Sequence, residues 1–187
     1  MKQFIFVAIL FFALCLLIPI MLLDRVRPNA DYTMIVSNIS GDDLRGGRAD
    51  QLSASNGDVY LKINKENGPT QKRGTYILRL NGNMEVLTVY HFPWYSATDF
   101  GISEEQELVI CARKIGMLYL YDMNGVLISS EKVKSVDIEE SKYNAILSST
   151  DRLTTSDGIC YRIVKQHYPF SISQTEENGS EIVREIF

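Results

Sequence analysis

Five Asn-Gly dipeptides divide the chain between residues 56 and 179 into short segments. They are Asn56-Gly57, Asn67-Gly68, Asn81-Gly82, Asn124-Gly125 and Asn178-Gly179. Asn and Gly both tolerate a positive φ, which the two central residues of a type I′ hairpin turn require. This density of hairpin signals favours a meander of short antiparallel strands over long helices.

The segments between these turns are rich in Val, Ile, Leu and Tyr, as strands usually are. Nine segments are expected to be strands: 58–64, 75–80, 84–90, 107–113, 117–122, 126–132, 143–149, 158–164 and 169–174. A single helical turn would fit best in the Glu-rich stretches 100–108 or 135–145. The sequence therefore predicts an all-β domain.

Residues 4–23, behind a short tail of residues 1–3, contain no charged side chain. A helix of this length rises about 30 Å, the thickness of a hydrocarbon core. We expect a single-pass signal-anchor helix in the cell membrane, with the soluble part outside the cytoplasm. The alternative is a protein secreted after signal cleavage, although a signal peptide has a shorter apolar run of about 7–15 residues.

The rest of the chain divides into a connector and a folded part. Residues 24–48 are polar and contain glycines, which indicates a mobile connector, with a possible strand at 32–36. Residues 49–187 carry the expected strands and form the predicted β-repeat domain.

Three glycines mark an internal repeat, because Gly74, Gly116 and Gly158 lie 42 residues apart. Each opens an expected strand that carries an aromatic and several aliphatic side chains. This pattern resembles the blades of a β-propeller, which have four short strands in each repeat of about 40–45 residues. The resemblance covers about residues 49–174 and implies about three blade-like units, an antiparallel meander that makes a partial propeller.

Three arrangements of these units remain open. The chain can form a partial propeller with open edges, two copies can join into a ring of six blades, or the strands can form an ordinary sandwich or barrel. Open edges would need to be covered by charge, by a partner or by self-association.

The sequence contains no Gly-rich nucleotide loop and no nucleophile-elbow motif. Its only histidines are His91 and His167, and its cysteines do not have zinc-finger spacing. We therefore name no catalytic residue, metal ligand or cofactor. Whether Cys111 and Cys160 form a disulfide stays open. A formal net charge of −4 without a basic stripe disfavours binding to nucleic acid.

An aromatic cluster is the candidate binding site. It consists of Tyr90, Phe92, Trp94 and Tyr95, and amphipathic rings of this kind dominate binding hot spots. A related His-Tyr-Pro-Phe sequence lies at 167–170. In the alternative interpretation, proline ends a strand in both places and the rings cover the core.

These features favour a membrane-anchored, extracytoplasmic interaction module whose partner is a protein, a carbohydrate or a second copy. An accessory or structural subunit of a membrane protein complex is the alternative. A third hypothesis, a hydrolase or lyase, requires carboxylates gathered in a propeller funnel.

Overall fold

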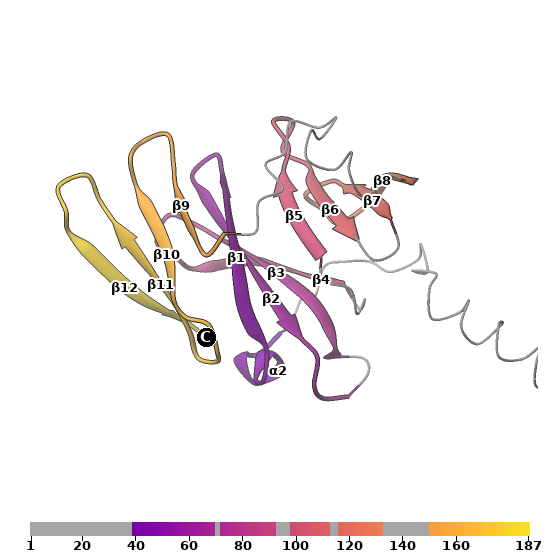
Figure 1. The fold of residues 1–187 in the computed structure, drawn as a ribbon, viewed down its shortest axis with the longest axis horizontal. Coiled ribbons are helices and arrows are strands. Elements are labelled where there is room, and N and C mark those ends of the chain that lie inside the picture. Colours follow the sequence, from indigo (N-terminus) through magenta and orange to yellow (C-terminus); the bar gives the residue numbers. More distant parts are fainter. Residues whose placement is uncertain (1–38, 70–71, 93–97, 113–115, 133–149) are drawn as a thin grey trace, which may run out of the picture. The chain divides into compact units, whose positions relative to one another are not determined.

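Twelve β-strands in the described residues form three antiparallel sheets of four strands each (Figure 1). A computed structural model describes residues 39–69, 72–92, 98–112, 116–132 and 150–187, and all of them belong to one compact unit. Sheet 1 consists of β1 (Arg48–Ser55), β2 (Asp58–Lys65), β3 (Gly74–Leu80) and β4 (Val86–Phe92). Sheet 2 consists of β5 (Thr98–Ile102), β6 (Leu108–Ala112), β7 (Met117–Tyr121) and β8 (Leu127–Lys132). Sheet 3 consists of β9 (Arg152–Thr154), β10 (Cys160–Lys165), β11 (Phe170–Thr175) and β12 (Glu181–Ile186).

The prediction of an all-β antiparallel fold is confirmed, and the three four-stranded sheets fit a β-propeller-like arrangement. Eight of the nine expected strands are present within a few residues of their predicted bounds. The ninth, 143–149, lies outside the described residues, as does the possible helical turn at 135–145. The other possible helical turn, 100–108, is instead the end of β5, a turn and the start of β6.

Sheet 1 packs against both of the other sheets. One of its faces contributes Leu61, Leu78 and other side chains to a cluster with Ile163 and Phe170 of sheet 3, which we call the 1–3 core. The opposite face contributes Tyr60, Ile77, Tyr90 and Phe92 to a second cluster with side chains of sheet 2, the 1–2 core. Residues 60 and 61 belong to different cores because successive side chains of a strand point to opposite faces.

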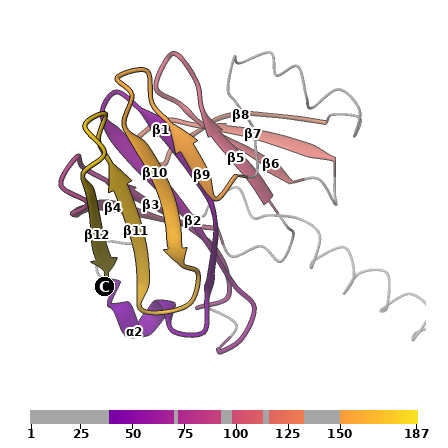
Figure 2. The ribbon, with the colours of Figure 1, turned by 60° about the vertical axis from the view of Figure 1, so that its left-hand side comes forward.

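Strand β1 links sheet 1 to both neighbours. The backbone N–H of Ala49 donates to the carbonyl of Gln166, and that of Leu52 donates to the carbonyl of Thr150, each over 2.8 Å. Figure 2 shows β1 together with the four strands of sheet 3. Between these two bonds, the side chain of Gln51 donates to Phe100 of sheet 2. One edge of β1 is therefore occupied by contacts with the other sheets.

Of the connector expected over 24–48, only residues 39–48 are described, and they contain a short helix. Residues Gly41–Leu44 form a short helix, α2, and Leu44 is fully buried in the 1–3 core. A polar sequence can be ordered in this way because a single apolar side chain enters the core while capping bonds satisfy the backbone. The expected strand at 32–36 and the apolar segment 4–23 lie outside the described residues. Within the part of the chain that is described, no helix has the length and apolar character needed to cross a membrane.

The three glycines of the 42-residue spacing do not occupy equivalent places. Gly74 opens β3 and Gly116 directly precedes β7, and each of these is the third strand of its sheet. Gly158 instead lies in the turn before β10, the second strand of sheet 3. All three have a positive φ, of 131°, 63° and 83°, which is the conformational reason for glycine. The 42-residue spacing therefore places a glycine at the start of the third strand in sheets 1 and 2, but not in sheet 3.

Candidate functional site

The aromatic cluster predicted to bind a partner is only partly described. Tyr90 and Phe92 lie at the end of β4, with 0% and 2% of their surfaces exposed. The Tyr90 hydroxyl donates to the carbonyl of Met123 over 3.0 Å, and the Phe92 ring meets Tyr121 edge to face at 5.6 Å. These two rings are therefore part of the 1–2 core. Trp94 and Tyr95 lie outside the described residues, and a recognition role for the cluster remains a prediction.

A charged pair lies beside Tyr60 and Tyr90 of the 1–2 core. The Arg79 guanidinium donates to the Asp58 carboxylate over 2.6 Å. Burial raises the pKa of Tyr60 to about 12, although the positive charge of Arg79 opposes this shift. A phenol with so high a pKa stays protonated near neutral pH and is a poor general base. The arrangement is suited to holding β2 and β3 in register.

A second polar row crosses three strands of sheet 1. The Asn64 amide donates to Asp50 over 2.7 Å and accepts from the Thr75 hydroxyl over 2.9 Å. The Lys62 ammonium, with only 5% of its side chain exposed, lies 3.3 Å from the same carboxylate. A buried charge needs such a partner, since unpaired burial in a low-dielectric interior is costly.

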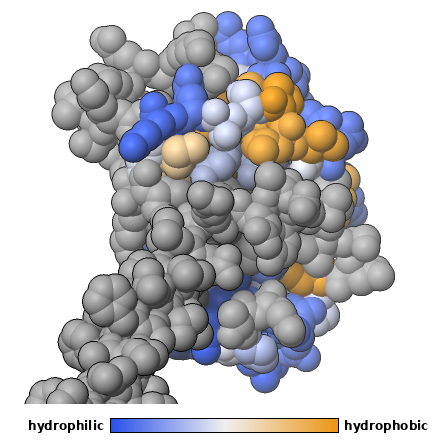
Figure 3. Space-filling view, turned by 90° about the vertical axis from the view of Figure 1, so that its right-hand side faces the viewer, coloured by the Kyte–Doolittle hydropathy of each residue, from blue (hydrophilic) through white to orange (hydrophobic). Residues whose placement is uncertain are grey.

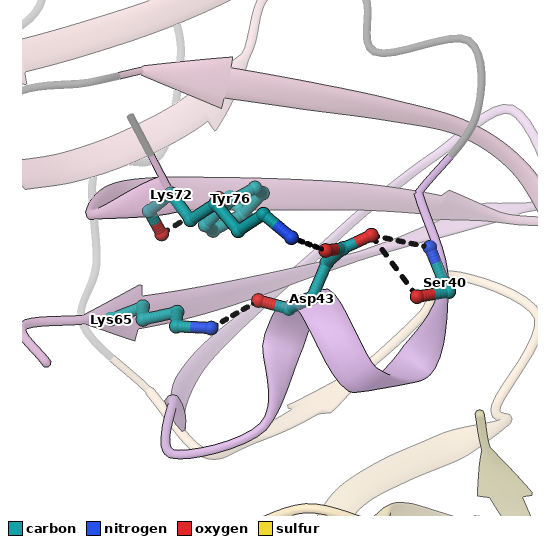
Figure 4. A network of polar contacts seen from close by, with 5 residues as sticks. All are labelled: Ser40, Asp43, Lys65, Lys72 and Tyr76. Atoms are coloured by element: carbon teal, nitrogen blue, oxygen red, sulfur yellow. Dashed lines mark hydrogen bonds and ion pairs between the residues drawn. The ribbon is translucent and has the colours of Figure 1, made fainter. Parts of the chain in front are cut away.

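The third polar cluster fixes α2 to sheet 1 (Figure 4). The Asp43 carboxylate accepts bonds from the backbone N–H and the hydroxyl of Ser40, both at 3.0 Å, and from the Lys72 ammonium. The bond from Lys72, followed by those from Ser40, lowers the pKa of Asp43 to about 2. Lys65 donates to the Asp43 backbone carbonyl, and burial lowers the pKa of its ammonium. The Tyr76 hydroxyl donates to the Lys72 carbonyl over 2.9 Å, so the cluster ends on β3.

The same helix also contacts the segments that flank β11 and β12. The Arg45 guanidinium lies over the Tyr168 ring, 5.5 Å from its centroid. Gly41 approaches so closely that a Cβ atom there would lie 2.7 Å from the Tyr168 hydroxyl and 2.9 Å from Cβ of Phe187. Helix α2 and its flanking residues therefore contact both sheet 1 and the segments next to sheet 3. We call the contacts of residues 40–45, in this and the preceding paragraph, the α2 clamp.

The two histidines have separate structural surroundings. His91 stacks on Tyr76 with ring centroids 4.2 Å apart, and its Nε2 lies 3.0 Å from the Arg73 carbonyl. Burial lowers the pKa of His91. His167 forms an isolated antiparallel bridge with Arg48. The structure does not bring the two histidines into one site.

The structure does not join Cys111 and Cys160 by a disulfide. Cys111 is buried in β6, whereas Cys160 in β10 is partly exposed and accepts a bond from Arg152 Nε over 3.2 Å. No group of three or more His, Cys, Asp or Glu side chains is arranged to hold a metal ion in the described part of the chain.

Exposed aliphatic side chains mark one side of sheet 2. Val126, in the turn before β8, is 59% exposed, and Ile128 on β8 is 50% exposed. Figure 3 views the molecule from the right-hand side of Figure 1, where β8 lies, and apolar atoms gather in the upper part of this face. The strand prediction for 126–132 located these residues, but their exposure depends on β8 being the edge strand of its sheet.

Comparisons with known proteins do not show a family for this chain. No family model and no curated protein matches the chain. Among solved structures, the chain is similar to a catalytically inactive variant of virginiamycin B lyase from Staphylococcus aureus, in a structure with quinupristin. The match has 13% sequence identity and a TM-score of 0.35, and it covers 82% of this chain. The chain spans 44% of the length of that lyase chain.

Proposed function

We propose that this protein is a membrane-anchored, extracytoplasmic interaction module that binds a protein partner through the exposed side of sheet 2. The observation that carries the proposal is the exposure of Val126 and Ile128, both at least half accessible, on a turn and an edge strand. Exposed apolar side chains that lie close together are typical of interaction sites. Edge strands also offer backbone groups for pairing with another chain.

The polar clusters support binding rather than catalysis. The Asp58–Arg79 pair, the row from Asp50 to Thr75 and the α2 clamp each join neighbouring strands or sheets. Their charged groups are engaged by other groups of the chain, which suits them to hold the sheets in place. A rigid scaffold of this kind presents a binding surface with little loss of conformational entropy.

The three sheets are, in this proposal, three blades of a partial β-propeller. Sheet 1 has apolar side chains on both faces, as a blade between two others requires, and its neighbours contribute one core each. The anchor is the segment 4–23, whose composition and length suit a membrane span.

The partner-binding surface is tested by substitution in the full-length chain. We expect V126S/I128S to abolish chemical cross-linking to a specific protein in native membranes and to leave urea unfolding unchanged. Leu87 on β4 is 51% exposed and provides the matched control L87S. Equal cross-linking by the wild type and by V126S/I128S would overturn the proposal, as would the absence of any specific product with the wild type.

The aromatic cluster is tested in the same assay with W94A. If Trp94 recognises the partner, this change abolishes cross-linking while the fold remains intact. A folding defect would instead place Trp94 in the core and would end the recognition hypothesis.

Membrane orientation has a separate test. Asn83 lies exposed in the turn between β3 and β4, and a cysteine at this position in a C160S background offers an accessible thiol. We expect N83C to react with a membrane-impermeant maleimide in intact cells. Labelling only after the cells are opened would contradict an extracytoplasmic domain.

A further inference from the structure

The outward face of sheet 3 has its charges sorted by strand. Tyr161, Ile163, Phe170, Ile172 and Ile186 point into the 1–3 core, so the alternate residues of these strands point away from it. The outward residues are Arg152 and Thr154 on β9, Cys160, Arg162 and Lys165 on β10, Ser171, Ser173 and Thr175 on β11, and Glu181, Val183 and Glu185 on β12. The face is thus basic on one side, neutral along β11 and acidic on the other side.

Most of these charges are exposed and unpaired. Arg162, Lys165, Glu181 and Glu185 are all exposed, and within the described residues none of them forms an ion pair. Val183 adds an apolar side chain that is 56% exposed. The face of sheet 2 opposite the 1–2 core is not exposed in this way, because Val109 and Cys111 of β6 lie there and are fully buried.

The pattern is complementary to itself. When two such faces meet about a two-fold axis that runs along β11, strand β12 of one copy lies over β10 of the other. The registers then place Lys165 opposite Glu185 of the second copy. Arg162 lies opposite Val183 of the second copy, between its Glu181 and Glu185. The same contacts occur twice, as in any two-fold interface.

Strand β11 permits the faces to approach. Its outward side chains are Ser171, Ser173 and Thr175, which are small and carry no charge, and each serine would lie opposite its own copy on the axis. Ser173 is only 2% exposed, so neighbouring side chains already cover it, and the contact between copies would be made by the longer side chains of β10 and β12. A larger or charged side chain on β11 would hold the two faces apart or repel its own copy.

We infer that sheet 3 is the self-association surface of this protein and that a second copy of the chain binds there face to face. This surface is independent of the partner-binding side of sheet 2. Four strands of about six residues cover about 400 Å², given the usual strand spacing and rise per residue, which is less than the roughly 800 Å² that each partner buries in a standard interface. The dimer is consequently weak and sensitive to salt, and attachment of both copies to one membrane would favour it by raising their effective concentration.

A charge-swap experiment tests the inference with the full-length chain in an uncharged detergent. One variant, R162E/K165E, makes β10 acidic like β12, and the other, E181K/E185K, makes β12 basic like β10. Light scattering, corrected for detergent, gives the protein mass over a range of concentrations and salt. We expect a wild-type dimer that dissociates at high salt, and for each variant alone a dimer at least about tenfold weaker, since like charges then face each other.

The equimolar mixture of the two variants is the decisive sample, because opposite charges face each other again in the mixed pair. We expect this heterodimer to form at least as well as the wild-type dimer, which also shows that both variants are folded. The control E104K/E105K makes the same change in net charge as E181K/E185K, but at an exposed turn of sheet 2, and should leave the dimer intact.

Three results would overturn the inference. The first is a wild type that is monomeric at every concentration and salt. The second is a dimer that both charge variants retain, which would place the contact elsewhere, for example in residues 4–23. The third is a mixture of folded variants in which no heterodimer forms.

Discussion

Gln51 donates a hydrogen bond from its side-chain amide to the backbone carbonyl of Phe100, 2.8 Å away. Gln51 is fully buried on β1, and Phe100 is fully buried on β5, so this bond joins sheets 1 and 2 without access to water. Backbone bonds from Ala49 and Leu52 reach the other neighbour of sheet 1. A short stretch of β1 therefore holds three sheets together.

Replacing Gln51 by alanine should destabilise the domain by about 1–3 kcal/mol, because it leaves the carbonyl of Phe100 buried without its donor. Urea unfolding measures the change. The control N83A alters an exposed turn residue and should stay within about 0.5 kcal/mol of the wild type. A Q51A protein as stable as this control would mean that the bond contributes nothing to holding the sheets together.

The burial of Tyr60 should make stability fall at high pH. Its pKa rises from 10.0 to about 12 on folding, so the unfolded chain loses the phenolic proton first as the pH increases. The contribution of this pKa shift to the free energy of unfolding is fully present below pH 10 and is lost as the pH rises from 10 to about 12. We expect Y60F to lose less stability over this interval, measured by urea unfolding at both ends. An identical loss in the two proteins would contradict the assignment to Tyr60.

The Asp43 carboxylate should act at the other end of the pH scale. Its pKa falls from 3.8 to about 2 on folding, chiefly through Lys72, so the unfolded chain takes up the proton first as the pH decreases. The contribution of this pKa shift to the free energy of unfolding is present above pH 3.8 and is lost as the pH falls to about 2. The stability difference between wild type and D43N should therefore shrink over this interval. A difference that does not vary with pH would show that the Asp43–Lys72 contact contributes no charge effect.

The close contact at Gly41 should make even a methyl group costly. G41A places Cβ against Tyr168 and Phe187 at less than 3 Å, and relieving such overpacking costs about 1–3 kcal/mol. Gly82 is the matched control, because its φ is not positive and the nearest atom to a Cβ added there would be the Gly57 carbonyl oxygen, 4.0 Å away. We expect G82A to unfold like the wild type. Equal stability of G41A and G82A would mean that α2 does not press against sheet 3.

The strands that the sequence predicted are those with strong apolar patterns, and the four that it missed have weaker ones. Strand β1 reads as polar, yet it buries Ala49, Gln51 and Leu52, because an irregular register between residues 49 and 51 disrupts the alternation of side chains. Strand β9 has only three residues, and β12 is largely charged and exposed. The sequence signal for such strands is weak, and their pairing depends on neighbours that come from elsewhere in the chain.

All five Asn-Gly dipeptides lie between strands, as predicted, but they did not determine the type of turn. Of the five, Asn56-Gly57 has a positive φ at both residues, as a type I′ turn requires. In the turn from Asp122 to Val126 only Gly125 has a positive φ, and the Asp122 carboxylate accepts bonds from the backbone of Asn124 and Val126. Met84 takes the corresponding position in the turn after Asn81-Gly82. Tertiary register and side-chain capping decide the type.

The candidate binding residues illustrate the same limit. Tyr90 and Phe92 have the composition of a recognition surface, but alternation along β4 turns both rings toward sheet 2. The exposed Val126 and Ile128 are indistinguishable in sequence from core residues. Which apolar side chains face solvent depends on the order of strands in the sheet.

The bonds from Ala49 and Leu52 to Gln166 and Thr150 also have a consequence for how the chain folds during its synthesis. Strands β2 and β3 are synthesised before β10, β11 and β12, which cover one of their faces. Until those strands are made, Leu61, Leu78 and their neighbours have no partner sheet, and an uncovered apolar face of this kind invites aggregation. Contacts so distant in sequence also slow folding. A chain that stops before β10 would therefore be a target for chaperones and proteases, even though sheets 1 and 2 are complete.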